Sequence, residues 1–116
     1  MSYAGGYKVR NYTLTLTTGT TLALSSVFGD TTVGGADDLS VQAIILQADP
    51  ANSAVIKIGD SQLSATVFGF MLQTPVGALS VPPVILGPFA DARVKPSMFS
   101  ALGTTGDKLH FMLIAY

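Results

Sequence analysis

Short apolar segments separated by turn residues recur roughly every ten residues along this chain, and this spacing limits the possible folds more than any other feature of the sequence. The clearest segment is 11–17, NYTLTLT, which places Tyr12, Leu14 and Leu16 on one face and three threonines on the other. A period of two predicts a half-buried β-strand. Counting such segments gives seven or eight short strands and no convincing helix. The sequence therefore predicts an all-β fold, an antiparallel, jelly-roll-like β-sandwich.

Two of the segments are apolar on both faces. Residues 39–48, LSVQAIILQA, lie between the turn signals Asp37-Asp38 and Asp49-Pro50. We expect a central strand covered on each side, and the β-branched residues favour it over the alternative of a helix. Residues 108–116, KLHFMLIAY, place His110, Met112 and Ile114 on one face and core-type residues on the other. This segment predicts a final strand inserted between two neighbours.

The remaining segments are shorter and carry stronger turn signals. Residues 20–24 are either the return of a hairpin or the same strand continued after a bulge. Residues 52–72 predict two short strands around a Gly59-Asp60 turn, and Gly69 between two phenylalanines predicts a bulge or a tight backbone passage. Pro82-Pro83 predicts an edge strand or a kinked crossover, because neither residue has an N–H group to donate.

The chain of 116 residues is long enough for one hydrophobic core, so we expect one domain. The start, Met1 to Tyr7, is small and interrupted by glycines, with Tyr3 and Tyr7 as its only large side chains. It is either a frayed terminus or an arm that the tyrosines anchor on a neighbouring subunit. We divide the chain into an arm, 1–10, and a β-sandwich domain, 11–116.

Charged residues are scarce. They make up 11% of the chain, against roughly 25% in ordinary soluble domains, and few charges are left to cover a free surface. Exposed neutral or apolar area usually marks a contact with something else, which suggests an assembly protein. The net charge of −1 argues against direct binding to nucleic acid or to an anionic membrane. With no spanning apolar window and no signal-peptide pattern, we expect a soluble protein made in the cytosol.

No residue pattern predicts catalysis or a cofactor. His110 is the only histidine, and no Gly-x-Ser-x-Gly motif accompanies it, so a satisfied or interface histidine is favoured. Asp30, Asp37 and Asp38 share a glycine-rich loop that could hold calcium, but their spacing favours turn formation. Gly106-Asp107-Lys108, like the Gly59-Asp60 turn, predicts a hairpin turn instead of a phosphate site. We therefore expect a protein that is not an enzyme and has no cofactor and no metal.

Several turn motifs in the second half of the chain form a familiar pattern. They are Asn52, Val55, Gly59-Asp60, Leu63 and Ala65, then Leu86 to Pro88, then Thr105 to Leu109. From Leu46 to Tyr116 the chain resembles small β-structured virion proteins of tailed bacteriophages, in which such hairpins recur in modules that decorate or cement the capsid or build head and tail fibres. The chain departs from the pattern at Phe68 to Leu72 and at Pro82-Pro83.

The resemblance implies a capsid decoration protein, made in the host cytoplasm and carried on the capsid surface, that binds major capsid protein as a homo-oligomer, a trimer in the family. It transfers no catalytic residue. The alternatives are a head or tail fibre module with the loop 25–38 as its binding tip, and a small carbohydrate-binding β-sandwich. The residues that we single out for contact with a partner are Tyr3, Tyr7, Lys8, Arg10, Phe28 and Asp30.

Overall fold

Alternating strand segments and intervening turns account for nearly all of the chain that the structure describes. The computed structural model describes residues 8–28, 40–72, 82–90 and 94–115. Its strands are β1 (Lys8–Thr15), β2 (Leu22–Ala23), β3 (Val41–Ala48), β4 (Ile56–Gly59), β5 (Phe70–Leu72), β6 (Val84–Leu86), β7 (Ser100–Leu102) and β8 (Lys108–Ala115). Two short 3-10 helices, η1 (Leu24–Val27) and η3 (Pro96–Met98), complete the described elements.

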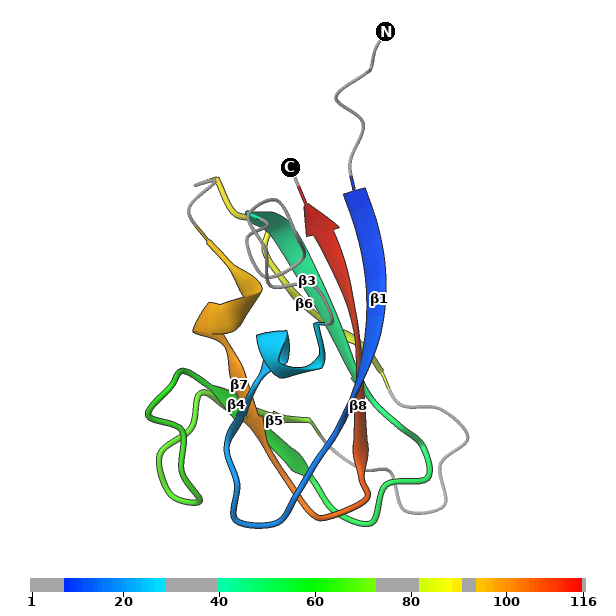
Figure 1. Ribbon diagram of the computed structural model, residues 1–116, viewed down its shortest axis with the longest axis vertical. Coiled ribbons are helices and arrows are strands. Elements are labelled where there is room, and N and C mark those ends of the chain that lie inside the picture. The colour runs from blue at the N-terminus through cyan, green and yellow to red at the C-terminus, as the bar shows by residue number, and fades with distance from the viewer. Residues whose placement is uncertain (1–7, 29–39, 73–81, 91–93, 116) are drawn as a thin grey trace, which may run out of the picture.

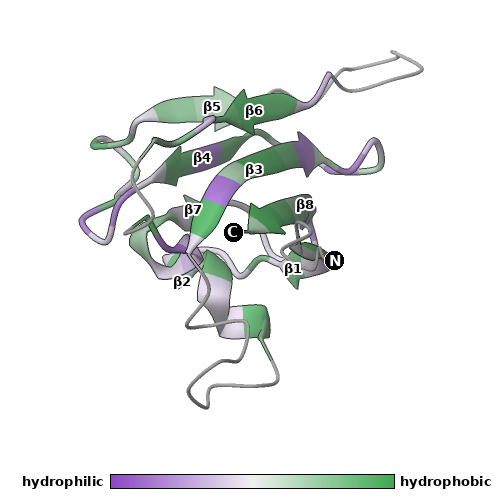
Figure 2. Cartoon of the chain, turned by 90° about the horizontal axis from the view of Figure 1, so that it is seen from above, coloured by the Kyte–Doolittle hydropathy of each residue, from purple (hydrophilic) through white to green (hydrophobic). Residues whose placement is uncertain are grey.

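The strands form two antiparallel sheets of four strands each (Figure 1). The first sheet has the order β1-β8-β3-β6, and the second has the order β2-β7-β4-β5. Viewed from above, the two sheets run side by side as two layers, with β6, β3, β8 and β1 in one and β5, β4, β7 and β2 in the other (Figure 2). The prediction of an all-β, sandwich-like architecture is confirmed, and the strand count agrees with the expected seven or eight.

The core lies between the two sheets and is built from the alternate side chains that point inward. Leu14, Ile44, Leu46, Leu109 and Leu113 come from the first sheet and are at most 2% exposed. They meet the inward side chains of the second sheet and of the segments beside it, which are Leu24, Ile56, Ile58, Leu72 and Ala101. Burial of such side chains stabilises a fold by about 1.5 to 3 kcal/mol for each large residue.

The long periodic segments fold as predicted. β8 is paired with β1 on one side and with β3 on the other, as expected for a final strand inserted between neighbours. Among the described residues, β6 is an edge strand that pairs with β3 alone, as Pro82-Pro83 predicts. Gly69 donates its N–H to the Ile58 carbonyl at 2.8 Å, and a Cβ there would lie 3.1 Å from the same oxygen. This is the predicted tight passage.

Residues 63–67 do not form the second strand predicted from their spacing. Ser64 holds this segment in a turn, since its hydroxyl accepts the N–H of Val67 at 3.0 Å. Leu63 reaches the core, whereas Val67 is 62% exposed. The chain becomes a strand only at Phe70. In this segment, hydrogen bonds from the backbone to a side chain replace the strand pairing that the period of two predicts.

The structure decides between the alternatives for residues 20–24 and differs from two expectations. A single bridge between Thr17 and Thr20 closes a tight turn, after which β2 joins the second sheet, so the hairpin does not continue. β1 begins at Lys8, so residues 8–10 belong to the sheet and not to the arm. β3 is not covered on both sides, because its outward side chain at Ile45 remains half-buried at the surface of the described chain. None of the described residues forms a helix long and apolar enough to cross a membrane.

Candidate functional site

The solvent side of the first sheet is the most distinctive surface in the described chain. Strand pairing and alternation place outward side chains in rows across the four strands, and we call ten of them, in three adjoining rows, the outer face. The exposed pair Thr15 and Lys108 continues the same side at the end of β1 and the start of β8. The rows are Val9, Ile114 and Ala43; Asn11, Met112, Ile45 and Ile85; and Thr13, His110 and Gln47.

Two of the three rows are mainly apolar. Val9 is 57% exposed, Ile85 is 62% exposed and Met112 is 36% exposed. Ile45 and Ile114 lie half-buried between them. Apolar side chains that adjoin one another across a whole sheet mark a surface that contacts something else.

An open depression of about 360 Å³ lies over this face. Asn11, Thr13, Gln47 and His110 contribute polar groups to its lining, and Met112 and Ile45 contribute apolar ones. The polar row thus borders the apolar rows in one continuous surface. Such a combination suits recognition more than it suits a core, because each polar group can pair while the apolar rows lose water.

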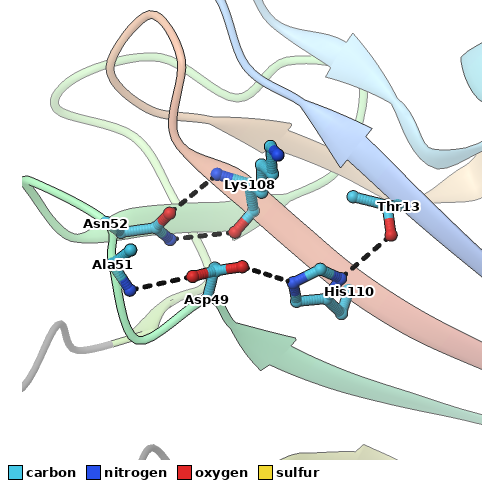
Figure 3. A network of polar contacts seen from close by, with 6 residues as sticks. All are labelled: Thr13, Asp49, Ala51, Asn52, Lys108 and His110. Carbon is cyan, nitrogen blue, oxygen red and sulfur yellow. Dashed lines mark hydrogen bonds and ion pairs between the residues drawn. The ribbon is translucent and has the colours of Figure 1, made fainter.

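His110 stands in the polar row and is bonded on both ring nitrogens (Figure 3). Its Nε2 lies 2.7 Å from Oδ2 of Asp49, and its Nδ1 lies 2.9 Å from Oγ1 of Thr13. An ionised carboxylate can only accept, so the neutral ring carries its proton on Nε2 and donates it to Asp49. Nδ1 is then the acceptor, and the Thr13 hydroxyl donates to it.

The order hydroxyl, imidazole, carboxylate is also found in hydrolases with an activated hydroxyl. Acyl transfer further requires donors aimed at a developing oxyanion. β8 is paired on both sides next to Thr13, so the N–H groups of this strand are engaged in the two ladders. In the described part of the chain, the network joins β1, β8 and the turn after β3 by hydrogen bonds.

The pKa of Asp49 is held below its ordinary value of 3.8. The hydrogen bond from His110 is the largest cause, and the bond from the backbone N–H of Ala51, at 2.8 Å, is the next. The charges of His110 and Lys108 act in the same direction, while burial opposes them. The folded chain thus favours the ionised carboxylate.

This depressed pKa predicts how stability responds to acid. Asp49 favours the folded state fully above its unfolded pKa, about 3.9, and this contribution is lost as the pH falls through the lower folded pKa. The free energy of unfolding of the wild type should exceed that of Asp49→Asn at pH 6, and this excess should shrink below about pH 4 as acid protonates the carboxyl. Urea unfolding from pH 6 to pH 2 measures it. A difference independent of pH would contradict the expectation.

A second polar cluster holds the turn after β3 against the turn before β8. The buried Asp107 carboxylate accepts the N–H of Ser53 at 2.9 Å and the N–H of Ala54 at 3.1 Å, and it also accepts the Ser53 hydroxyl. The Asn52 amide bonds to both backbone groups of Lys108, at 2.8 Å each (Figure 3). These contacts fix the turn that carries Asp49 beside His110.

The structure separates the residues singled out from the sequence. Tyr3, Tyr7 and Asp30 lie outside the described residues. Lys8 pairs with Ala115 in the β1–β8 ladder, and Arg10 is half-buried opposite Leu113 on the inward side of the sheet. Arg10 therefore does not lie on the outer face.

Phe28 belongs to the core and not to an exposed binding tip. It is 7% exposed, and its ring centroid lies 4.6 Å from that of Tyr12 and 6.4 Å from that of Phe111. This packing leaves little of the ring for a partner. Asp37 and Asp38, the other two candidate calcium ligands, also lie outside the described residues, and no group of three or more His, Cys, Asp or Glu gathers in the part that is described.

Sequence reasoning identified one strand of the outer face but not the surface as a whole. The alternation in 108–116 already separates His110, Met112 and Ile114 from the core positions. Val9, Ile85 and the other outward residues join this surface through the register of strand pairing, which the sequence alone does not provide. Asp49 is expected from the sequence only as a turn residue.

The sequence matches no protein-family model, and comparisons with curated proteins and with solved structures find no match either.

Proposed function

We propose that this chain is a structural virion protein of a tailed bacteriophage that decorates and cements the capsid at junctions between major capsid subunits. The observation that carries the proposal is the outer face, where Val9, Ile85 and Met112 remain uncovered in a chain with only 11% charged residues. A protein with such a surface is suited to permanent contact. Its role requires no reaction, no cofactor and no direct contact with nucleic acid or membrane.

The strand order supports a jelly roll, which is the finer form of the fold that we propose. Strand β1 neighbours β8, β2 neighbours β7, β3 neighbours β6 and β4 neighbours β5, all antiparallel. This order arises when the chain forms one long antiparallel hairpin, with its bend between β4 and β5, and the hairpin then wraps so that its strand pairs alternate between two sheets. Jelly rolls are common in viral capsid proteins and in lectins.

Two groups of residues that carry the resemblance lie in direct contact with each other. Asn52 lies in the first group of matching residues, and Asp107 and Lys108 lie in the last group. The Asn52 amide and the Asp107 carboxylate join these groups by direct hydrogen bonds. The motifs therefore work as one structural unit, as expected of a module whose likeness to phage proteins rests on turn chemistry.

Cementing follows from mass action. A protein that binds the assembled shell and not its free subunits stabilises the shell by RT ln(1 + [L]/Kd), about 2.7 kcal/mol per site at one hundred times Kd. In the phage proteins that the chain resembles, the added protein is a homotrimer, which we propose here as well. Closed symmetry would also cover edge strands that few charges protect.

The depression over Asn11, Thr13, Gln47 and His110 favours a second candidate, a small carbohydrate-binding β-sandwich. Its polar groups could bind hydroxyls. However, the outer face lacks an aromatic platform among its described residues, because Tyr12 and Phe111 point toward the core. Titration of isotope-labelled protein with neutral oligosaccharides, followed by NMR, tests this role. Chemical-shift changes confined to Asn11 and Gln47 would favour it over cementing.

The cement role is tested on shells of the phage that encodes this chain, assembled without the protein. Added protein should raise the temperature at which half of the shells survive and should protect them at low salt, because each bound copy adds buried contact area across a junction. Light scattering and electron microscopy measure survival. Equal survival with and without the protein, at saturating concentration, would refute the proposal.

A further inference from the structure

We propose that the open edge of β1 binds an extended segment of another protein chain as an added strand, and that an acidic side chain of this segment pairs with Arg10. Within the proposed function, the segment belongs to a major capsid subunit, and only this identity of the partner rests on that function. The lengths of the edge strands, the direction of their backbone groups and the charge beside β1 support the inference.

β1 is the one long edge strand of the described sandwich. The two sheets end at β1 and β6 and at β2 and β5. β2 has two residues, β5 and β6 have three each, and Pro83 and Pro88 flank β6. Short strands and prolines keep further strands from joining an edge. β1 has eight residues, pairs with β8 over all of them without a bulge and contains no proline, so none of these protections applies to it (Figure 1).

The backbone groups of alternate residues in β1 point to the open edge. Leu16 donates its N–H to the Asp107 carbonyl at 2.8 Å, in the register of the β1–β8 ladder. Even-numbered residues of β1 therefore form the hydrogen-bonded pairs with β8, because such pairs alternate along an antiparallel ladder. The N–H and C=O groups of Val9, Asn11 and Thr13 then point away from β8, and they bond to no described residue. An extended chain that joins the sheet would bond to all of them.

Arg10 determines the chemistry that the segment needs. It is half-buried on the inward side of β1, and no carboxylate among the described residues is bonded to it. On an antiparallel added strand, the residue opposite Arg10 would belong to a non-hydrogen-bonded pair, in which the side chains approach most closely. An acidic residue at this position gains a cross-strand ion pair, whereas a basic residue meets a like charge.

The described strands of a second copy do not supply such a segment. β2, β5 and β6 are too short to cover β1, and β1 itself, KVRNYTLT, contains no aspartate or glutamate. Two β1 strands placed side by side would leave both Arg10 side chains without a carboxylate. The edge therefore favours a different protein chain as its partner, which is the relation between a decoration protein and a capsid subunit.

A synthetic peptide of about seven residues, valine and threonine in alternation with one central aspartate, is long enough to cover the edge and tests the inference. NMR of isotope-labelled protein at millimolar peptide should show shifts and slower hydrogen exchange at the amides of Val9, Asn11 and Thr13. A peptide with lysine in place of the aspartate should bind about fivefold more weakly, and Arg10→Gln should remove this difference. Absence of binding, equal binding of the two peptides to the wild type, or shifts confined to other strands would each overturn the inference.

Asn11→Pro tests the role of the backbone, and Asn11→Ala is its matched control. Proline removes one N–H of the edge and places its ring where the added strand would lie, whereas alanine keeps the N–H. Asn11→Pro should bind the aspartate peptide at least about tenfold more weakly than Asn11→Ala does. Equal binding by the two variants would overturn the inference. Circular dichroism checks that both variants fold, and the pair of peptides on the wild type decides the question if Asn11→Pro does not.

Capsid shells assembled without the protein separate this inference from the proposed function. In co-sedimentation, Asn11→Pro should bind shells more weakly than Asn11→Ala, again at least about tenfold. Equal shell binding by the two variants would overturn the inference and leave the cement role standing. Capture of the aspartate peptide at β1 by a protein that does not protect shells would leave the inference standing without the cement role.

Discussion

Replacing Gly87 with alanine should destabilise the fold by about 3 kcal/mol. Gly87 has a φ of +115°, a backbone conformation that residues other than glycine rarely adopt. An added Cβ would also lie 2.7 Å from the Gln42 carbonyl oxygen. The clash involves backbone, which cannot rotate away. That oxygen also accepts the N–H of Phe89 at 2.7 Å, so a shift would disturb the attachment of the segment after β6 to β3. Urea unfolding followed by circular dichroism measures the loss.

Gly19→Ala is the matched control for Gly87→Ala. Gly19 also has a positive φ, +78°, but no atom lies within 4 Å of the Cβ that alanine would add. Its substitution should destabilise by about 1 kcal/mol, from backbone conformation alone. Equal losses at the two glycines would mean that the close approach to Gln42 contributes nothing, contrary to our expectation.

Asp107→Ala should destabilise the protein by about 3 kcal/mol, because it removes one buried acceptor that several donors share. The N–H groups of Ser53 and Ala54 and the Ser53 hydroxyl all bond to this carboxylate, which belongs to a residue only 6% exposed. Removal of the Asp107 carboxylate also frees the turn that holds Asp49 beside His110. Thermal and urea unfolding measure the effect, and the chemical shift of the His110 ring reports on the turn.

Asp60→Ala provides the comparison for Asp107→Ala. Asp60 is exposed, and its carboxylate accepts the N–H of Gln62 at 2.9 Å within its own turn. Removing this single exposed contact should destabilise by about 0.5 to 1 kcal/mol. If the two aspartates prove equally important, the joining of distant turns by Asp107 adds nothing to the stability of the fold.

The parts of the fold that could be predicted from the sequence are those with long, regular periodicity. Residues 11–17 and 108–116 alternate over several residues, so the inward face and the position of β8 between neighbours followed from burial alone. Residues 63–67 have the same spacing over a shorter length, yet the Ser64 hydroxyl competes successfully for the backbone there. A period of two over a few residues does not distinguish a strand from such a turn.

The candidate site could be predicted only in part, because it depends on contacts between distant residues. Asp49 and His110 are 61 positions apart, and Asn52 and Lys108 are 56 positions apart. A single sequence indicates which side chains share a face of one strand, but the pairing between strands also depends on turn geometry. For the same reason Phe28 was assigned to a binding loop, although its ring packs against Tyr12.

The nested strand order has a consequence for how the chain folds. β4 and β5 are separated by one loop, whereas β1 and β8 are separated by nearly the whole chain. Because closing a longer loop loses more entropy, we expect pairing to begin at β4 and β5 and to end with β1 on β8. The outer face needs β1, β8, β3 and β6 together, so it is among the last features to form. A chain still in the course of folding would then lack this apolar surface, and only finished molecules would present it to a partner.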